Sequence, residues 1–259
     1  RRRGRCTQTA QAALKACRLS AEEDYWIATG NCENVSDASE RQACKQDASA
    51  AQRDTKAECG THFDARKEIC AALGEDPYDP TIDPVNFVAG VTNPFFPLTP
   101  GTTFVYQNEE EEITIVVTHE TKEILGVTCI VVRDTVRLRE SGELVEDTDD
   151  WYAQDKDGNV WYMGELSKSF EDGELVSLEG SWKAGVDNAK PGIIMLAAPQ
   201  IGKVYRQEFF LGDAEDMGEV LSITDSATVP AASCDGTCLV TKDFLPLDPG
   251  HVEHKYYAP

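Results

Sequence analysis

The stretch that decides the first part of the fold is CRLSAEEDYWIATGNCENVSDASERQACKQDASAAQRDTKAEC, residues 17–59. It holds four of six cysteines whose spacings read 11, 15, 12, 15 and 11, a palindrome centred on residue 38. An antiparallel hairpin would produce such a palindrome. Spacings of 11 and 15 rotate an α-helix by about 20° and about 60°, so each arm keeps its cysteines on one broad face. The predicted disulfides are Cys6–Cys70, Cys17–Cys59 and Cys32–Cys44.

The residues around these cysteines favour two helices. From residue 6 to 72 the chain is rich in Ala, Gln, Glu, Lys and Arg and contains no proline. Asp37 can cap the second helix, with Glu40 at the spacing of a capping box, and Gly74 can end it. We expect a disulfide-stapled α-hairpin over residues 1–76.

The reason for stapling this hairpin lies in its small core. Most of the residues between the predicted arms are alanines, so two helices alone would bury little apolar surface, and each disulfide adds about 2–4 kcal/mol. A three-helix bundle with other cysteine pairings is the alternative. A hairpin of this kind is typical of a spacer, a docking arm or a self-assembly element.

The rest of the chain has the pattern of a β domain. Residues 77–101 form a proline-rich linker and lead-in, and residues 102–259 alternate apolar and polar side chains with a period of two. Tight turns are expected at residues 109–112, 141–142, 157–159 and 172–173, so neighbouring strands run antiparallel. No helix long enough for a parallel crossover is present. The predicted fold class is α+β, with the hairpin followed by a strongly curved antiparallel β-sheet or β-barrel domain.

Cysteine content and charge indicate a secreted protein, either extracellular or periplasmic. Nine cysteines without a C-x-x-C metal pattern favour disulfides in an oxidising compartment. Residues 77–259 carry 12 Lys and Arg against 33 Asp and Glu, a net charge of −21. Such an acidic surface repels nucleic acid and anionic lipid, and no apolar run reaches the roughly 18 residues that a membrane helix needs. We therefore expect no nucleic-acid partner and no membrane insertion.

Three cysteines lie in the β domain. Cys234 and Cys238 flank a short turn, which favours a local disulfide and leaves Cys129 free and buried. The alternative pairs Cys129 with Cys238 and leaves Cys234 exposed. Neither arrangement provides a base that would activate a cysteine nucleophile.

Five stretches of the β domain carry a resemblance. They are NPFFPLTPGTTFVY (93–106), VTHETKEILGVTCIVVRDTV (117–136), DWYAQDKDGNVWYMGE (150–165), GSWKAGVDNAKPGIIM (180–195) and VEHKYYAP (252–259). On these stretches the chain resembles a family of uncharacterised secreted bacterial proteins over roughly residues 93–259, while the helical hairpin is not covered. The resemblance implies a β-domain fold and secretion, and no established activity.

Two histidines are candidate metal ligands. His119 alternates in register with Val117 and other apolar residues, and His254 alternates with Val252, so both are expected to point inward from different strands. Together with a carboxylate or thioether they could hold a transition metal, copper or zinc. Hydrogen-bonded core histidines are the alternative. The remaining candidate ligands are Glu208, Met195 and Met217.

Carboxylates supply two weaker candidates. Asp155, Asp157 and Asn159 resemble the opening of a calcium loop, but the same letters form a common hairpin turn. A pair of carboxylates could also perform acid–base chemistry on a sugar, although strand spacing cannot place two of them at a catalytic distance. The candidates for such a pair are Glu165, Asp187, Glu208, Asp213, Glu215 and Asp216.

These observations lead to three functional hypotheses. The first is an exported, non-enzymatic binding protein whose β-domain interior holds a metal ion or a small ligand. The second is a structural protein that assembles into homo-oligomers or filaments, with the α-hairpin as the contact arm. The third and weakest is a carboxylate-based hydrolase, because the sequence contains no recognised catalytic motif.

Overall fold

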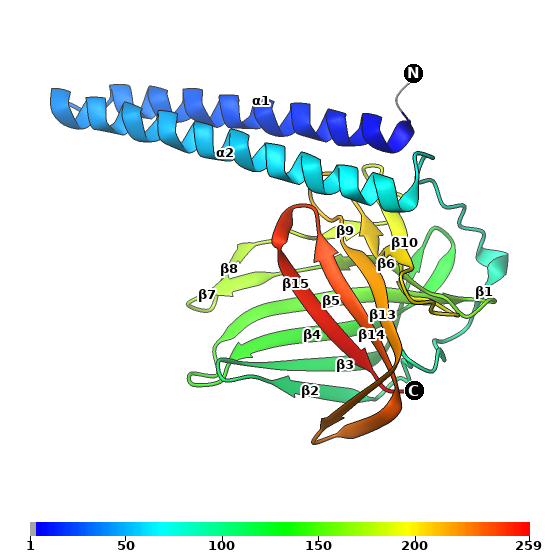
Figure 1. The fold of residues 1–259 in the computed structure, drawn as a ribbon. Helices are drawn as coiled ribbons and strands as arrows, with labels where there is room; N and C mark the ends of the chain where they lie inside the picture. The colour runs from blue at the N-terminus through cyan, green and yellow to red at the C-terminus, as the bar shows by residue number, and fades with distance from the viewer. Residues whose placement is uncertain (1–3) are drawn as a thin grey trace. The chain divides into compact units, whose positions relative to one another are not determined.

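The computed structural model describes residues 4–259, which form two long helices followed by fifteen strands (Figure 1). The chain divides into two compact units. One comprises Arg1–Tyr78 with Pro246–Gly250, and the other comprises Asp79–Leu245 with His251–Pro259. No helix within the described residues combines the length and the apolar character needed to cross a membrane.

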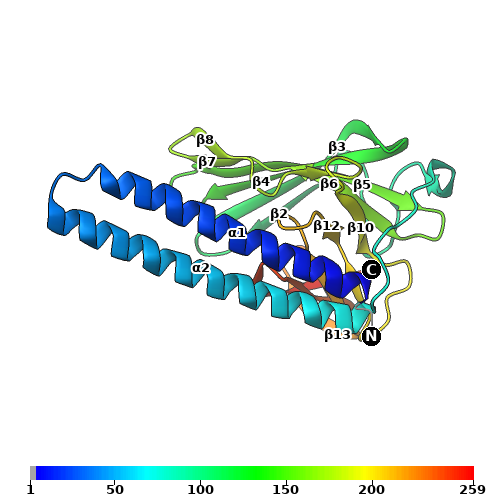
Figure 2. The ribbon, with the colours of Figure 1, turned by 90° about the horizontal axis from the view of Figure 1, so that it is seen from above.

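The first unit contains the predicted antiparallel hairpin. Helix α1 spans Arg5–Glu33, helix α2 spans Ala38–Leu73, and Figure 2 shows the two lying side by side with one bend between them. Three nested disulfides join them with Cα–Cα distances of 5.6, 5.9 and 5.7 Å. The predicted pairings are confirmed: Cys6–Cys70, Cys17–Cys59 and Cys32–Cys44.

Local contacts fix the ends of this hairpin. The carboxylate of Asp37 accepts hydrogen bonds from the backbone N–H groups of Ser39 and Glu40, at 2.8 and 2.9 Å, and so caps α2. At the open end, Glu75 accepts a hydrogen bond of 2.6 Å from the hydroxyl of Thr7. The buried side chains between the helices are mostly alanines and half-cystines, so the disulfides supply cross-links that packing alone would not.

The second unit contains a large antiparallel sheet of eleven strands, which curls strongly into a half-barrel (Figure 1). Its strands are β1 (Phe87–Val88), β2 (Thr103–Gln107), β3 (Glu111–Ile124), β4 (Val127–Leu138), β5 (Leu144–Asp155), β6 (Val160–Leu166), β7 (Ser169–Glu171), β8 (Glu174–Ser177), β9 (Trp182–Lys183), β10 (Lys190–Met195) and β12 (Glu208–Phe209). Along the main path the order is β12-β10-β6-β5-β4-β3-β2. The predicted α+β class with a strongly curved sheet is confirmed.

Tight turns connect these strands, but the turn expected at residues 109–112 lies at residues 108–110, because Glu111 and Glu112 already belong to β3. The turn between β7 and β8 is Asp172–Gly173, and both residues have positive φ, 51° and 79°. Such a two-residue turn twists with the strands that it joins, and glycine adopts this conformation without strain. The expected turn at residues 157–159 likewise separates β5 from β6.

A second sheet of four strands faces the half-barrel. Its order is β11-β13-β14-β15, and its strands are β11 (Val204–Arg206), β13 (Met217–Val229), β14 (Ala232–Leu245) and β15 (Asp248–Tyr257). Val117 and Val132 of the large sheet share one apolar cluster with Val220 and Leu239 of the small sheet. The two sheets therefore pack face to face around an apolar core.

The segment before β2 is pinned to this unit. Val91 and Leu98 belong to the same apolar cluster. The buried side chain of Asn93 donates a hydrogen bond of 2.9 Å to the carbonyl of Gly158, and β1 pairs with the end of β5. Residues 79–101 thus contribute to the core of the β unit.

Candidate functional site

The inner face of the large sheet carries a row of carboxyl groups beside the apolar core. Cross-strand partners share a face, and Asp134 of β4 lies opposite Thr148 of β5, while Asp150 of β5 lies opposite Glu165 of β6. Glu146 is two residues from Thr148 and lies on the same side. Three neighbouring strands therefore bring four carboxyls to one surface.

Asp150 and Glu165 form the most buried pair of this row. Asp150 is 9% exposed, and its Oδ1 accepts a hydrogen bond of 2.5 Å from the hydroxyl of Tyr162. Burial, followed by the charges of Asp134 and Glu146, raises the pKa of Asp150 to about 7. Burial and the neighbouring Asp150 raise the pKa of Glu165 to about 8. Near neutral pH the pair therefore retains a proton that ordinary carboxyls would have lost.

Two further acids lie beside this pair. Glu208 of β12 is 6% exposed and accepts a hydrogen bond of 2.6 Å from the indole N–H of Trp182, the residue opposite Glu165 in the sheet. Burial, together with the charge of Asp216, raises the pKa of Glu208. Burial also raises the pKa of Asp216 to about 6, although Lys255 opposes this shift. The acids thus continue from the large sheet into the segment that joins β12 to β13.

The small sheet adds an acid and a cation. Asp243 of β14 is 7% exposed and accepts hydrogen bonds from Thr241 and Gln207 at 2.7 and 3.1 Å. The ammonium of Lys255 on β15 lies 2.9 Å from the Asp243 carboxylate. Although burial lowers the pKa of Lys255, the charge of Asp243 raises it further, so the lysine stays protonated. The Lys255 side chain is 47% exposed, so this end of the row is open to water.

We call these seven acids the inner acidic cluster. Three of its members, Asp150, Glu208 and Asp243, are buried, and the other four are partly exposed. Water therefore contacts one part of the cluster and is excluded from the other. Asp134 has one oxygen, Oδ1, that is excluded from water and accepts no hydrogen bond from the described residues. Burial and the charge of Glu146 raise its pKa to about 6. The cluster consists of Asp134, Glu146, Asp150, Glu165, Glu208, Asp216 and Asp243.

Aromatic rings line the same face. Tyr152 and Tyr162 are cross-strand partners whose rings stack at 4.9 Å, and Trp182 meets Tyr162 edge to face at 5.4 Å. Phe96 from the lead-in contacts Tyr152 at 5.4 Å. Stacked aromatic faces next to carboxylates attract positively charged groups that also have apolar surface.

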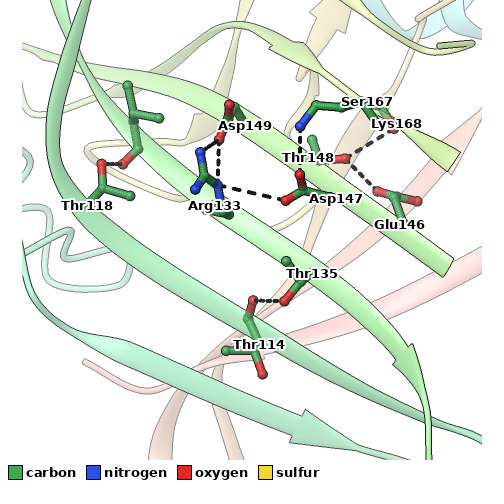
Figure 3. Close-up of polar contacts among 11 residues, drawn as sticks. Thr114, Thr118, Arg133, Thr135, Glu146, Asp147, Thr148, Asp149, Ser167 and Lys168 are labelled. Carbon is green, nitrogen blue, oxygen red and sulfur yellow. Dashed lines mark hydrogen bonds and ion pairs between the residues drawn. The ribbon is translucent and has the colours of Figure 1, made fainter. Parts of the chain in front are cut away.

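The opposite face of β4 and β5 differs, because its acids are paired with cations. Arg133 bonds the carboxylate of Asp149 at 2.9 Å, and Lys168 bonds Asp147 at 2.6 Å (Figure 3). Successive residues of a strand point to opposite faces, so Asp149 and Asp150 are neighbours in sequence with different surroundings. The inner acids differ from Asp147 and Asp149 because most of them form no ion pair with a described residue.

The prediction that His119 points inward is wrong, because its side chain is exposed. Val117 does point inward and is 0% exposed, but the pairing of β3 with β4 shifts immediately after it. Thr118 in this bulge donates a hydrogen bond of 2.7 Å to the carbonyl of Val131. A β-bulge interrupts the alternation of side chains, and this interruption turns His119 outward.

The prediction that His254 points inward is also wrong, because that residue is exposed. On β15 the inner face carries Lys255 and Tyr257, which contact Asp243 and Phe96. The alternation of this strand is therefore as expected, but the two faces are reversed. The face of β15 that points inward is the one that carries Lys255, because Lys255 pairs with the buried carboxylate of Asp243 on β14.

The other proposed metal ligands do not join these histidines. Met195 and Met217 are buried at 1% and 0%, and the sulfur of Met217 lies 3.8 Å from the guanidinium of Arg206. Glu208 belongs to the inner acidic cluster. Within residues 4–259, no group of three or more His, Cys, Asp or Glu side chains is arranged to hold a metal ion.

The proposed calcium ligands form the hairpin turn that was the alternative. Asp155 accepts hydrogen bonds from the backbone and side chain of Asn159, both at 2.9 Å, and from the indole of Trp161 at 2.8 Å. Asn159 in turn accepts a hydrogen bond from Ala197. Protein donors therefore occupy the oxygens of Asp155 and Asn159, and Asp157 lies at the exposed tip.

The cysteines of the β domain follow the favoured arrangement. Cys234 and Cys238 form a disulfide, and Cys129 is a free thiol that is 0% exposed. Burial raises the pKa of the Cys129 thiol to about 12, so it is not a reactive nucleophile.

Sequence reasoning named some members of the cluster and missed others. Glu165, Glu208 and Asp216 were candidates, whereas Asp134 and Asp150 were not. Asp134 follows Arg133 and Asp150 follows Asp149, and both faces of these strands carry charged and apolar residues, so alternation alone does not identify the inner acids.

No protein family, curated protein or solved structure matches the chain.

Proposed function

We propose that the chain is an exported, non-enzymatic binding protein whose β-domain interior takes up a small organic cation such as an amine. The single observation that carries this proposal is the inner acidic cluster, in which Asp243 is the one member that forms an ion pair with a cation of the described residues. The four disulfides and the resemblance to secreted bacterial proteins support export, because disulfides persist in oxidising compartments.

The surroundings of the cluster favour an organic cation over a bare metal ion. Metal ions require several ligands converging on one point, and no such group occurs within the described residues. An ammonium group carries N–H donors that fit the unpaired oxygen of Asp134. Its alkyl part can contact the stacked rings of Tyr152 and Tyr162. Of the two ligand classes expected from the sequence, a metal ion or a small ligand, these contacts favour a small ligand that carries a positive charge.

The release of protons on binding provides a test of this proposal. Asp150 and Glu165 have raised pKa values of about 7 and about 8, so a cation that binds beside them must displace a proton. Uptake of an amine near neutral pH should release protons and weaken as the pH falls below about 6, where Asp150 and Glu165 are protonated. Calorimetry in two buffers of different ionisation enthalpy measures both effects.

The test uses putrescine as the probe and its diacetylated, uncharged form as the matched control. Wild-type protein should bind putrescine and not the diacetylated form. Asp150→Asn should weaken binding, whereas Asp149→Asn, which alters the opposite face, should not. Native mass spectrometry would report a cation that was retained during purification. If neither putrescine nor a monoamine or guanidine produces heat or a mass shift, the proposal is wrong.

A further inference from the structure

The α-hairpin carries a groove that the proposed ligand does not use. The groove has a volume of about 550 Å³, and two leucines from α1, Leu14 and Leu19, form its apolar part. Leu19 is 55% exposed, so the groove presents apolar surface to solvent. Lys15, Arg18 and Lys56 line the same groove together with one acid, Glu22.

Three cations of the groove are unpaired within residues 4–259. Lys15, Arg18 and Lys56 form no hydrogen bond or ion pair with any described residue, although other hairpin lysines do, such as Lys45 with Glu33 at 2.6 Å. An apolar floor bordered by unpaired positive charge is complementary to an acidic segment that also carries apolar side chains.

The β domain of the same chain contains a segment with these properties. Four consecutive glutamates, Glu109–Glu112, cover the β2–β3 turn and the first two residues of β3, and the side chains of Glu109 and Glu110 in the turn are exposed and form no pair with a described residue. The turn is held in shape because Asn108 accepts hydrogen bonds from the backbone of Glu110 and Glu111, at 2.8 and 2.7 Å. Leu138, opposite Glu111, is 36% exposed.

We propose that the hairpin groove of one copy of this chain binds the β2–β3 turn of a second copy, so that the copies associate head to tail. Charge complementarity selects the second copy as the occupant, because the groove has a positive charge and residues 77–259 have a net charge of −21. The narrow hairpin turn can enter a groove that a flat sheet face cannot. Two different surfaces meet, so the contact builds an open chain or a ring instead of a closed dimer.

Sedimentation velocity of the full chain tests this contact at low and high salt. The wild type should associate with micromolar affinity at low salt and dissociate as salt shortens the Debye length to a few ångströms. The groove variant Lys15→Glu/Arg18→Glu and the turn variant Glu109→Lys/Glu110→Lys should each lose association by at least about tenfold. The control variant Arg53→Glu/Lys67→Glu lies outside the groove and changes the net charge by the same amount as the groove variant. It should associate as the wild type does.

Mixing the two variants distinguishes this contact from general charge effects. The groove variant keeps an intact turn and the turn variant keeps an intact groove, so the mixture should form dimers that grow no further. Circular dichroism confirms that each variant is folded. A wild type that stays monomeric at every concentration overturns the proposal, and so does a mixture that shows no dimer. A monomer whose groove is protected from acetylation at Lys15 would indicate that the groove is occupied within the same chain.

Discussion

Replacing Asp150 with asparagine should make the protein less sensitive to alkaline pH. The folded protein holds the pKa of Asp150 at about 7, against an ordinary value of 3.8. Between these two values the folded state binds a proton that the unfolded state has lost, so this group lowers the unfolding free energy as the pH rises. From about pH 5 to pH 8 the loss is about 2–3 kcal/mol.

Asparagine removes this loss and keeps the local structure. Its side-chain oxygen can still accept the hydrogen bond that Tyr162 donates to Asp150 at 2.5 Å, but the amide cannot ionise. The stability of Asp150→Asn relative to the wild type should therefore increase by about 2–3 kcal/mol between about pH 5 and pH 8. Loss of the neighbouring charge should also lower the pKa of Glu165, since Asp150 contributes to raising it.

Urea unfolding followed by tryptophan fluorescence measures this difference. Three of the four tryptophans lie in the β domain, and the fourth, Trp26, is 62% exposed, so its emission changes little on unfolding. The matched control is Asp149→Asn, which removes a surface ion pair with Arg133 and should cost less than about 1 kcal/mol. A relative stability of Asp150→Asn that is the same at both pH values would refute the reasoning.

Three further substitutions test the packing that supports the cluster and the hairpin. Trp182→Phe removes the donor to buried Glu208, so it should cost about 1–3 kcal/mol in urea unfolding and raise the pKa of Glu208 further. Gly164→Ala should cost about 2 kcal/mol or more in the same assay, because Gly164 has a φ of 131° and an added Cβ would lie 2.4 Å from the carbonyl oxygen of Trp182. Cys17→Ala/Cys59→Ala opens a loop of sequence separation 42 and should lower hairpin stability by about 4 kcal/mol, measured by thermal unfolding in the far ultraviolet.

The hairpin was predictable from the sequence because its constraints are local and covalent. Six cysteines with palindromic spacing allow one nested set of pairs, and Asp37 marks the start of the second helix. The same holds for Asp172–Gly173, a turn whose backbone requirements select its residues. Each of these signals depends on residues that lie near one another in sequence or are joined by disulfides.

The positions of the histidines were not predictable from alternation alone. A period of two separates the faces of a strand, but it does not identify the inner one when both carry charged and apolar residues. On β15, Val252 and Tyr256 favoured one face, and the ion pair of Lys255 with Asp243 selects the other. On β3, a bulge after Val117 interrupts the alternation, and no residue type marks such a bulge in this stretch.

The inner acidic cluster also changes how the charge of the β domain is interpreted. A net charge of −21 on residues 77–259 is consistent with a solvated acidic surface, and exposed acids such as Glu109 fit that explanation. Solubility does not explain Asp150 and Glu208, which are 9% and 6% exposed, because buried acids contribute little to solvation and destabilise the fold when they ionise. On the same strand, Asp149 forms an ion pair with Arg133, so an acid at this part of the sheet can be neutralised by a cation of the chain itself. The proposed binding of a cation would account for buried acids that lower stability when they ionise.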